Sequence, residues 1–401
     1  MGVTSHGRNY RLLVAGLAVP QITSVLIVAV TAFALGPSGR GEIAFAQATA
    51  TTIAVVGGWG FYLSAAASGQ SLIPRQYFDL TLGFTAALSA GVVIVAVLAP
   101  RGLLVVPGAL LIGFAAVMTA GTTYCQRLAQ ARASDFEYLV IGSVPPLVSL
   151  VTIVPALLLG CAPSTVVAVW ALSTSIGFAA AVYRTRRAVA TRRESSRGLV
   201  FYVRSSLAVG AANVSSFLAL RGDTVILGIA STAVQVGYYS VSVAMAGLLL
   251  YVSEAFSLRT ISRYVPGQSP GPFVEESFGR AWKAAGLAAL LSIPFMIGGW
   301  GVLHFVFAEF EPAFPAFLVL CLAAIPTSFV RVLVSAASMV GLRRLLSWYS
   351  ALCFGLLAIY LPVAPGGATW LAVASLVIYS LQAVFVAIGL RMAQANIAGD
   401  A

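Results

Sequence analysis

The sequence predicts an all-α membrane protein that crosses the bilayer about twelve times, in two related halves of six helices each. Three observations carry this prediction. Of the 401 residues, 60% are hydrophobic and only 9% are charged, whereas ordinary globular domains are about 25% charged. The apolar residues fall in runs of roughly 20, the length that crosses the hydrocarbon core of a bilayer. A short pattern in the first half also recurs after the midpoint of the chain. A soluble globular protein is therefore excluded.

Twelve apolar runs are candidate spans, separated by short polar segments that contain Pro or Gly. The first run follows Arg8 and Arg11 and is too long for the core of a signal peptide, so we expect it to be retained. The seventh is the weakest candidate, because Arg221 and Asp223 lie inside it. The runs cover residues 12–35, 43–66, 80–99, 103–124, 138–160, 164–183, 205–229, 236–256, 282–306, 314–339, 345–363 and 368–390.

The connecting loops are short, and none could hold a folded catalytic domain. The longest joins the eighth and ninth spans and carries Pro266 and Gly267. The sequence has no Gly-x-x-x-x-Gly-Lys-Ser/Thr loop, which argues against nucleotide hydrolysis, and residues 68–77 lack the loop pattern of major-facilitator proteins. The four cysteines are scattered and the two histidines are isolated, so neither a disulfide framework nor a metal site is expected. We expect a transporter without a cofactor, not an enzyme.

Basic residues indicate the orientation in the membrane. With the N-terminus inside, nineteen of the 23 Lys and Arg residues fall in inside segments, whereas only Arg40 and Arg101 fall in outside loops. This asymmetry predicts that both termini face the cytoplasm. The densest basic segment, residues 184–204, follows the sixth span. We interpret it as a topological anchor near anionic headgroups, with a nucleic-acid or partner site as the less favoured alternative.

The two halves of the chain share a pattern. Residues 35–48 and 231–244 each join the first two spans of their half, and Gly41 aligns with Gly237. Six spans followed by six in the same orientation predict a parallel repeat, with the two bundles related by an axis along the membrane normal and the transport path between them. We therefore expect an N-terminal lobe of residues 1–198, ending in the basic cytoplasmic linker, and a C-terminal lobe of residues 199–401.

Three charged residues inside spans are the main candidates for a substrate site: Arg221, Asp223 and Arg331. Such residues are costly in lipid and usually face a polar cavity or a partner. Arg221 and Asp223 are two positions apart, so on a helix they point to different sides. A guanidinium is always charged and suits phosphate, so two arginines at one cavity would suit a diphosphate. The alternatives are an internal Arg331–Asp223 bridge, or arginines that snorkel to an interface.

Uncharged polar residues add a weaker signal. Gln21 in the first span and Asn213 in the seventh are candidate cavity residues, although helix packing through small and weakly polar side chains is the default explanation. Two acidic residues are candidates for carrying a coupling proton. They are Asp223 and Glu254, and Glu254 lies near the inner end of the eighth span, where a position among the headgroups is the alternative.

Three stretches carry a family resemblance. They are Leu35-Gly-Pro-Ser-Gly-Arg-Gly-Glu42; Arg221-Gly-Asp-Thr-Val-Ile-Leu-Gly228 with Gly237-Tyr-Tyr-Ser-Val-Ser-Val-Ala244; and Phe314-Pro-Ala-Phe-Leu-Val-Leu, leading through Arg331 to Gly341-Leu-Arg-Arg344. Together they resemble the corresponding segments of bacterial polysaccharide or O-antigen flippases (Wzx-like), within the multidrug/oligosaccharidyl-lipid/polysaccharide (MOP) exporter superfamily. The resemblance extends over nearly the whole chain through loose patterns.

This resemblance implies a MATE/MOP-like fold of two pseudo-symmetric six-helix lobes in a V shape around a cationic cavity. It implies a protein of the bacterial cytoplasmic membrane that moves an undecaprenyl-diphosphate-linked oligosaccharide to the outer leaflet for cell-surface polysaccharide or lipopolysaccharide biosynthesis. The expected partners are the lipid-linked oligosaccharide, membrane lipids, and a polysaccharide polymerase and glycosyltransferases, with no nucleic acid. The chain departs from the pattern in its first span, which carries no charged residue.

Two other functions remain alternatives. A cation-coupled multidrug exporter of the same superfamily needs acidic cavity residues in the first lobe, and spans one to six contain none. A membrane glycosyltransferase or ligase would depend on acidic residues of the outer loops, such as Glu309 and Glu311, but these loops are short.

Overall fold

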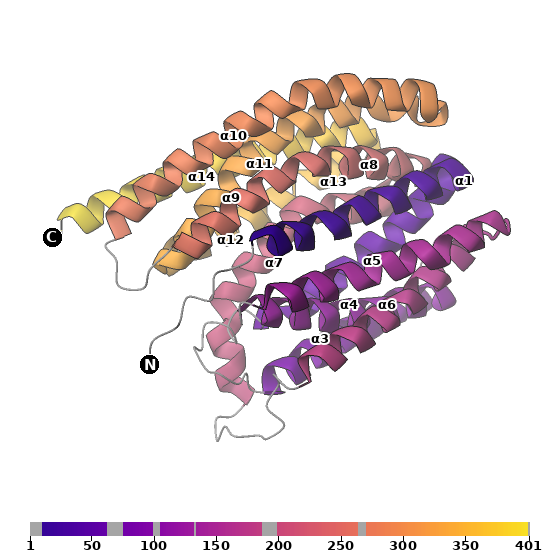
Figure 1. Ribbon diagram of the computed structural model, residues 1–401, viewed down its shortest axis with the longest axis horizontal. Coiled ribbons are helices and arrows are strands. Elements are labelled where there is room, and N and C mark those ends of the chain that lie inside the picture. The colour runs from indigo at the N-terminus through magenta and orange to yellow at the C-terminus, as the bar shows by residue number, and fades with distance from the viewer. Residues whose placement is uncertain are drawn as a thin grey trace. The chain divides into compact units, whose positions relative to one another are not determined.

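The chain folds almost entirely into helices. A computed structural model describes residues 10–61, 75–98, 105–131, 134–186, 199–263 and 270–399 (Figure 1), and among these residues there is no β-strand. The all-α prediction is confirmed. Some predicted features lie outside the described residues: the linker segment 187–198, most of the loop 68–77, Pro266 with Gly267, and Arg101.

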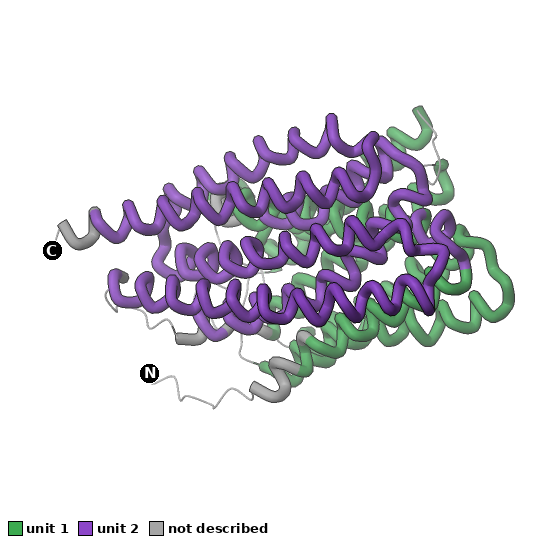
Figure 2. Tube along the Cα trace, turned by 90° about the horizontal axis from the view of Figure 1, so that it is seen from above, with its two compact units in different colours: residues 1–34, 42–214 green, residues 35–41, 215–401 purple. Residues whose placement is uncertain are grey.

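The chain divides into two compact units (Figure 2). Unit 1 comprises residues 1–34 and 42–214, and unit 2 comprises residues 35–41 and 215–401. The boundary therefore falls inside a helix, α7. The predicted division into lobes at residues 198 and 199 stays a prediction.

Unit 1 is a bundle in which α4 packs against α3, α5 and α6, and α5 also packs against α6. Hydroxyls and glycines mediate these contacts, as expected where lipid gives helices no hydrophobic reason to associate. Ser149 on α5 and Ser173 on α6 are hydrogen-bonded at 2.6 Å, and Gly177 accommodates the ring of Pro145. Its helices are α1 (Tyr10–Gly58), α3 (Arg75–Leu98), α4 (Val106–Ala131), α5 (Asp135–Leu158), α6 (Pro163–Thr185) and the first half of α7 (Leu199–Ala230).

Unit 2 is built around α11, which packs against α8, α9, α10, α12 and α14. Of the most apolar stretch of α11, 61% is buried, the largest share among the candidate spans. The elements of this unit after α7 are α8 (Ala233–Ala246), η1 (Gly247–Leu249), α9 (Leu250–Arg263), α10 (Pro270–Gly301), η2 (Val302–Val306), η3 (Ala308–Ala313), α11 (Phe314–Val340), α12 (Arg343–Leu357), α13 (Tyr360–Val363), η4 (Ala364–Gly366) and α14 (Ala368–Gly399).

Ten stretches of the described residues are helical, long and apolar enough to cross a membrane. Helix α1 contains the first predicted span and residues 43–58 of the second, and the two count as one stretch, which accounts for one difference from twelve. The seventh predicted span lies in α7, whose 32 residues reach about 48 Å and are also long enough to cross. Helix α7 is not among the ten, and it carries Arg221 and Asp223. About twelve crossings therefore remain consistent with the fold.

The segment predicted as the first outer loop is instead part of α1. Helix continues on both sides of Gly36, which alone adopts a non-helical conformation (φ 63°, ψ −174°) that favours glycine. Arg40 was assigned to the outside loop between the first two spans, but it lies within this helix; the side of the membrane that it faces stays a prediction. Its side chain is only 3% exposed, and its Nε donates a hydrogen bond to Ser240 Oγ at 3.2 Å. The sequence predicted that this segment joins two spans, but not that helix resumes immediately after Gly36.

The two glycines aligned by the sequence repeat lie at one helix crossing inside unit 2. A Cβ at Gly41 would overlap the carbonyl oxygen of Ala233, and a Cβ at Gly237 would overlap the carbonyl oxygen of Pro37. The contacts are reciprocal, because each glycine meets the residue four positions before the other. Because neither glycine has a side chain, the two backbones can approach closely, as in membrane helix pairs that cross through small residues.

We predict that Gly41→Ala or Gly237→Ala will destabilise the protein by about 1–3 kcal/mol, because the added methyl group must push two backbones apart. Thermal unfolding of the purified protein in detergent is the measurement. Gly286→Ala on α10 is the matched control, since a Cβ there has open space. An unchanged melting temperature for both crossing variants would show that the close approach is unimportant.

Candidate functional site

A small cavity in unit 2 brings together charged residues from distant parts of the sequence. Residues of α7, α8, η1, α9, α11 and α14 line it, and its volume is about 50 Å³. Most of the lining is apolar, and the polar side chains are those of Arg221, Asp223, Thr327, Arg331 and Tyr379. This volume is enough for a few water molecules. It is far smaller than the roughly 300–1,000 Å³ of pockets that bind drug-sized ligands.

The carboxylate of Asp223 is the buried anchor of the cavity wall. Its side chain is 2% exposed, and it accepts hydrogen bonds from Tyr239 Oη at 2.5 Å and from the backbone N–H of Thr224 at 2.6 Å. A buried carboxylate requires such donors, because removing it from water without them is very costly. Helix α8 supplies Tyr239, so the hydrogen bond joins α7 to α8.

Further hydroxyl groups extend this network to α13 and α14. Ser375 Oγ lies 3.3 Å from Tyr239 Oη and 3.0 Å from Tyr360 Oη. Tyr360 and Tyr379 both donate to the carbonyl oxygen of Ala219, at 3.2 and 3.1 Å, one helical turn before Asp223. Sequence reasoning missed these tyrosines. The available signal was that a tyrosine inside an apolar span needs a partner for its hydroxyl group.

Arg221 and Asp223 both line the cavity, but they differ in burial. Arg221 is exposed whereas Asp223 is buried. Within the described part of the chain, no ion pair of Arg221 within 4 Å is found. Its guanidinium nevertheless lines the same cavity as Arg331. Arg221 is therefore an exposed cation at the cavity with no ion pair among the described residues.

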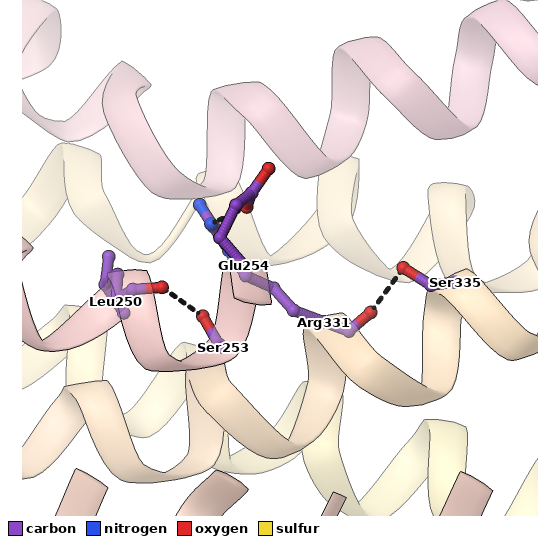
Figure 3. A network of polar contacts seen from close by, with 5 residues as sticks. All are labelled: Leu250, Ser253, Glu254, Arg331 and Ser335. Atoms are coloured by element: carbon purple, nitrogen blue, oxygen red, sulfur yellow. Dashed lines mark hydrogen bonds and ion pairs between the residues drawn. The ribbon is translucent and has the colours of Figure 1, made fainter. Parts of the chain in front are cut away.

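Arg331 is paired with Glu254 (Figure 3). Its Nη1 donates to Glu254 Oε2 at 2.7 Å, and the two side chains are 29% and 30% exposed. The alternative of an Arg331–Asp223 bridge is therefore wrong: Asp223 is satisfied by Tyr239 and Thr224, and Arg331 by Glu254. The Arg331 carbonyl oxygen accepts a hydrogen bond from Ser335 Oγ at 2.9 Å, within regular α11 helix.

The two uncharged candidates belong to unit 1. Gln21 is half-buried on α1, and Asn213 is half-buried on α7, where it has an interaction partner. Neither lines the unit 2 cavity. Their place in a substrate site stays a prediction, while Arg221, Asp223 and Arg331 do share one cavity and Glu254 is attached to it through Arg331.

The chemistry available at this cavity is anion binding. Two guanidinium groups offer planar donors that match phosphate or carboxylate oxygens. Among the described residues, no group of three or more His, Cys, Asp or Glu side chains is placed to hold a metal ion. The net charge of Arg221, Arg331, Asp223 and Glu254 is zero, so an anionic ligand must compete with the resident carboxylates for the arginines.

Comparison with known proteins supports the fold. No protein-family model matches the chain, and no curated protein matches it in sequence. Among solved structures it is similar to a multidrug resistance MATE family transporter of the MOP superfamily in an inward-facing conformation, with a TM-score of 0.68, 13% identity, and coverage of 96% of this chain and 99% of that one.

It is also similar to the lipid II flippase MurJ in an inward closed conformation, with a TM-score of 0.73 and 9% identity over 95% of this chain and 87% of that one. A MOP superfamily transporter from Pyrococcus furiosus, described as having a binding pocket of reverse polarity, aligns with a TM-score of 0.55 and 11% identity over 97% and 95%. The chain therefore has the fold of MOP superfamily transporters, as predicted.

We predict that Tyr239→Phe will destabilise the protein by about 1–3 kcal/mol, because the buried Asp223 carboxylate loses its shortest hydrogen bond while remaining buried. Thermal unfolding in detergent measures the effect. Tyr238→Phe is the control: this neighbouring tyrosine is half-buried and contacts the ring of Phe310, and no hydrogen bond of its hydroxyl is found in the described part of the chain. Equal melting temperatures for the two variants would contradict the role of the Tyr239–Asp223 bond.

Proposed function

We propose that this chain is a flippase of the bacterial cytoplasmic membrane that moves an undecaprenyl-diphosphate-linked oligosaccharide across the bilayer by alternating access. The observation that supports it most is the placement of Arg221 and Arg331 at one cavity among membrane helices. A diphosphate is a compact anion, and two guanidinium groups are suited to binding it. The sugars attached to the diphosphate are too polar to cross lipid unaided, so the substrate requires a shielded path through protein.

Alternating access is supported by the size of the cavity. At about 50 Å³ it cannot contain a diphosphate with sugars attached, so binding requires the helices around it to separate. The chain has features suited to such a change: Gly36 interrupts α1, and η1 interrupts the helical run between α8 and α9. Short 3₁₀ segments between helices often mark hinges.

The Gly41–Gly237 crossing is a second feature of this kind. Residues 35–41 belong to unit 2, while the parts of α1 on both sides of them belong to unit 1. We propose the Gly36 kink and the unit boundary inside α7 as places where the chain bends during transport.

The remaining parts of the proposal rest on sequence. Both termini face the cytoplasm, the lobes meet near residue 198, and Asp223 and Glu254 are the candidates for ion coupling. A polysaccharide polymerase and glycosyltransferases would consume and supply the lipid-linked oligosaccharide, for O-antigen or a related polymer. Gln21 and Asn213 would add uncharged contacts to the sugars or the diphosphate.

A second candidate function is export of organic cations coupled to an ion gradient. The likeness to a multidrug resistance MATE family transporter and the buried carboxylate of Asp223 at the cavity favour it. Vesicles that contain the purified protein separate the two functions: an exporter would accumulate a cationic dye inside them under an ion gradient, whereas the proposed flippase would not.

We predict that Arg331→Gln and Arg221→Gln will each slow the crossing of a fluorescent lipid-linked oligosaccharide at least about ten-fold, because each removes a charge-assisted contact to the diphosphate. The measurement is the rate of crossing in vesicles that contain purified protein. Arg344→Gln, an exposed arginine at the start of α12 and outside the cavity, should leave the rate unchanged.

Two results would contradict the proposal. One is the absence of any acceleration by the unmodified protein over protein-free vesicles. The other is a normal rate in both cavity variants, which would remove the two arginines from the substrate path.

A further inference from the structure

We propose that Glu254 is an internal substitute for the substrate's phosphate: it occupies Arg331 while no substrate is bound, and substrate binding transfers Arg331 from Glu254 to the diphosphate. This role rests on the proposed function, since it assigns a competing counter-ion to the same site. It makes Glu254 a residue that sets the threshold for anion binding, because only a ligand that interacts with Arg331 better than the resident carboxylate can displace it.

The contact itself is of the type that phosphate would make. Arg331 Nη1 donates to Glu254 Oε2 at 2.7 Å, a short charge-assisted bond (Figure 3). The donors of a guanidinium group match the oxygens of a carboxylate and those of a phosphate. The side chains of both residues are about one-third exposed, so neither is locked in a dry interior, and a displaced Glu254 can be hydrated.

Arg331 and Glu254 lie on helices that differ in how firmly they are held. Arg331 lies on α11, the most buried of the candidate spans and the centre of unit 2. Glu254 lies in the second turn of α9, directly after the 3₁₀ turn Gly247–Leu249. In the first turn of α9, Ser253 Oγ donates a hydrogen bond to the Leu250 carbonyl oxygen at 2.6 Å. The carboxylate is therefore the partner placed to move.

The cavity geometry links this movement to ligand entry. Gly247 and Leu250, on either side of the last turn before α9, line the same cavity as Arg221 and Arg331. A diphosphate needs more room than the present 50 Å³, and displacement of α9 at this turn would enlarge the cavity and withdraw Glu254 together. Arg221, which already lines the cavity and is exposed, would supply the second cation.

The test is the affinity of the purified full-length protein for farnesyl diphosphate, a soluble probe with the proposed head group. Isothermal titration calorimetry in detergent measures this affinity, and farnesol is the uncharged control. Glu254→Gln should bind farnesyl diphosphate about three- to ten-fold tighter than the unmodified protein, since the ligand no longer competes with a carboxylate. Glu254→Asp keeps the charge but has a shorter reach, so it should show a smaller gain.

A double-mutant cycle separates competition for Arg331 from general repulsion of anions. If Glu254 acts through Arg331, the gain in affinity from Glu254→Gln disappears in an Arg331→Gln background. A gain that came only from weaker repulsion of the anion would persist in that background. Glu276→Gln is the matched control: this carboxylate pairs with Arg280 on α10, away from the cavity, and its loss should leave the affinity unchanged.

The outcomes also distinguish this role from the proposed function. Equal or weaker binding by both Glu254 variants, or a gain that persists without Arg331, overturns the counter-ion role alone. Failure of farnesyl diphosphate to bind any of the proteins overturns the counter-ion role together with the diphosphate substrate. The predicted gain in a protein that translocates no lipid-linked oligosaccharide supports the counter-ion role and contradicts the flippase.

Discussion

Every charge placed among apolar helices needs a partner, and this constraint organises unit 2. Lipid offers no hydrogen bonds, so an unpaired ion inside the bilayer is destabilising. Asp223 meets the constraint with Tyr239 and Thr224, and Arg331 meets it with Glu254. These bonds connect α7 to α8 and α9 to α11, so the partners of the charges also determine which helices lie together. Arg221 differs from the other three charges, because it is exposed and lines a cavity.

The hydrogen bonds of Asp223 and the ion pair of Arg331 have different consequences. The network around Asp223 is buried and joins four elements through hydroxyl groups, which makes it a structural support of the cavity wall. The Arg331–Glu254 pair is partly exposed and lies next to a break between helices. A pair of this kind contributes little to stability, but it can exchange partners. Selection for a transport cycle would favour this combination of a fixed buried anion and an exchangeable ion pair.

The sequence predicted the helices well because run length and charge directly report the cost of crossing lipid. Charges stand out against an apolar background, so the sequence also drew attention to Arg221, Asp223 and Arg331, and these three residues line one cavity. It could not predict the partners: Glu254 and Arg331 are 77 positions apart, and many helix arrangements would satisfy either residue differently. The partner of Arg40 was missed for a related reason, because Ser240 lies 200 positions away, in the aligned segment of the repeat. The repeat aligned Gly41 with Gly237, yet only the structure shows that the aligned glycines meet.

The central claim is that Arg221 and Arg331 bind the diphosphate of a lipid-linked substrate after Glu254 releases Arg331. An electron cryomicroscopy structure of the protein with bound undecaprenyl diphosphate tests it most directly. The account predicts phosphate oxygens about 3 Å from the guanidinium nitrogens of both arginines, with the Arg331–Glu254 bond broken and the cavity enlarged. A head group bound elsewhere, with the Arg331–Glu254 bond intact, would contradict it.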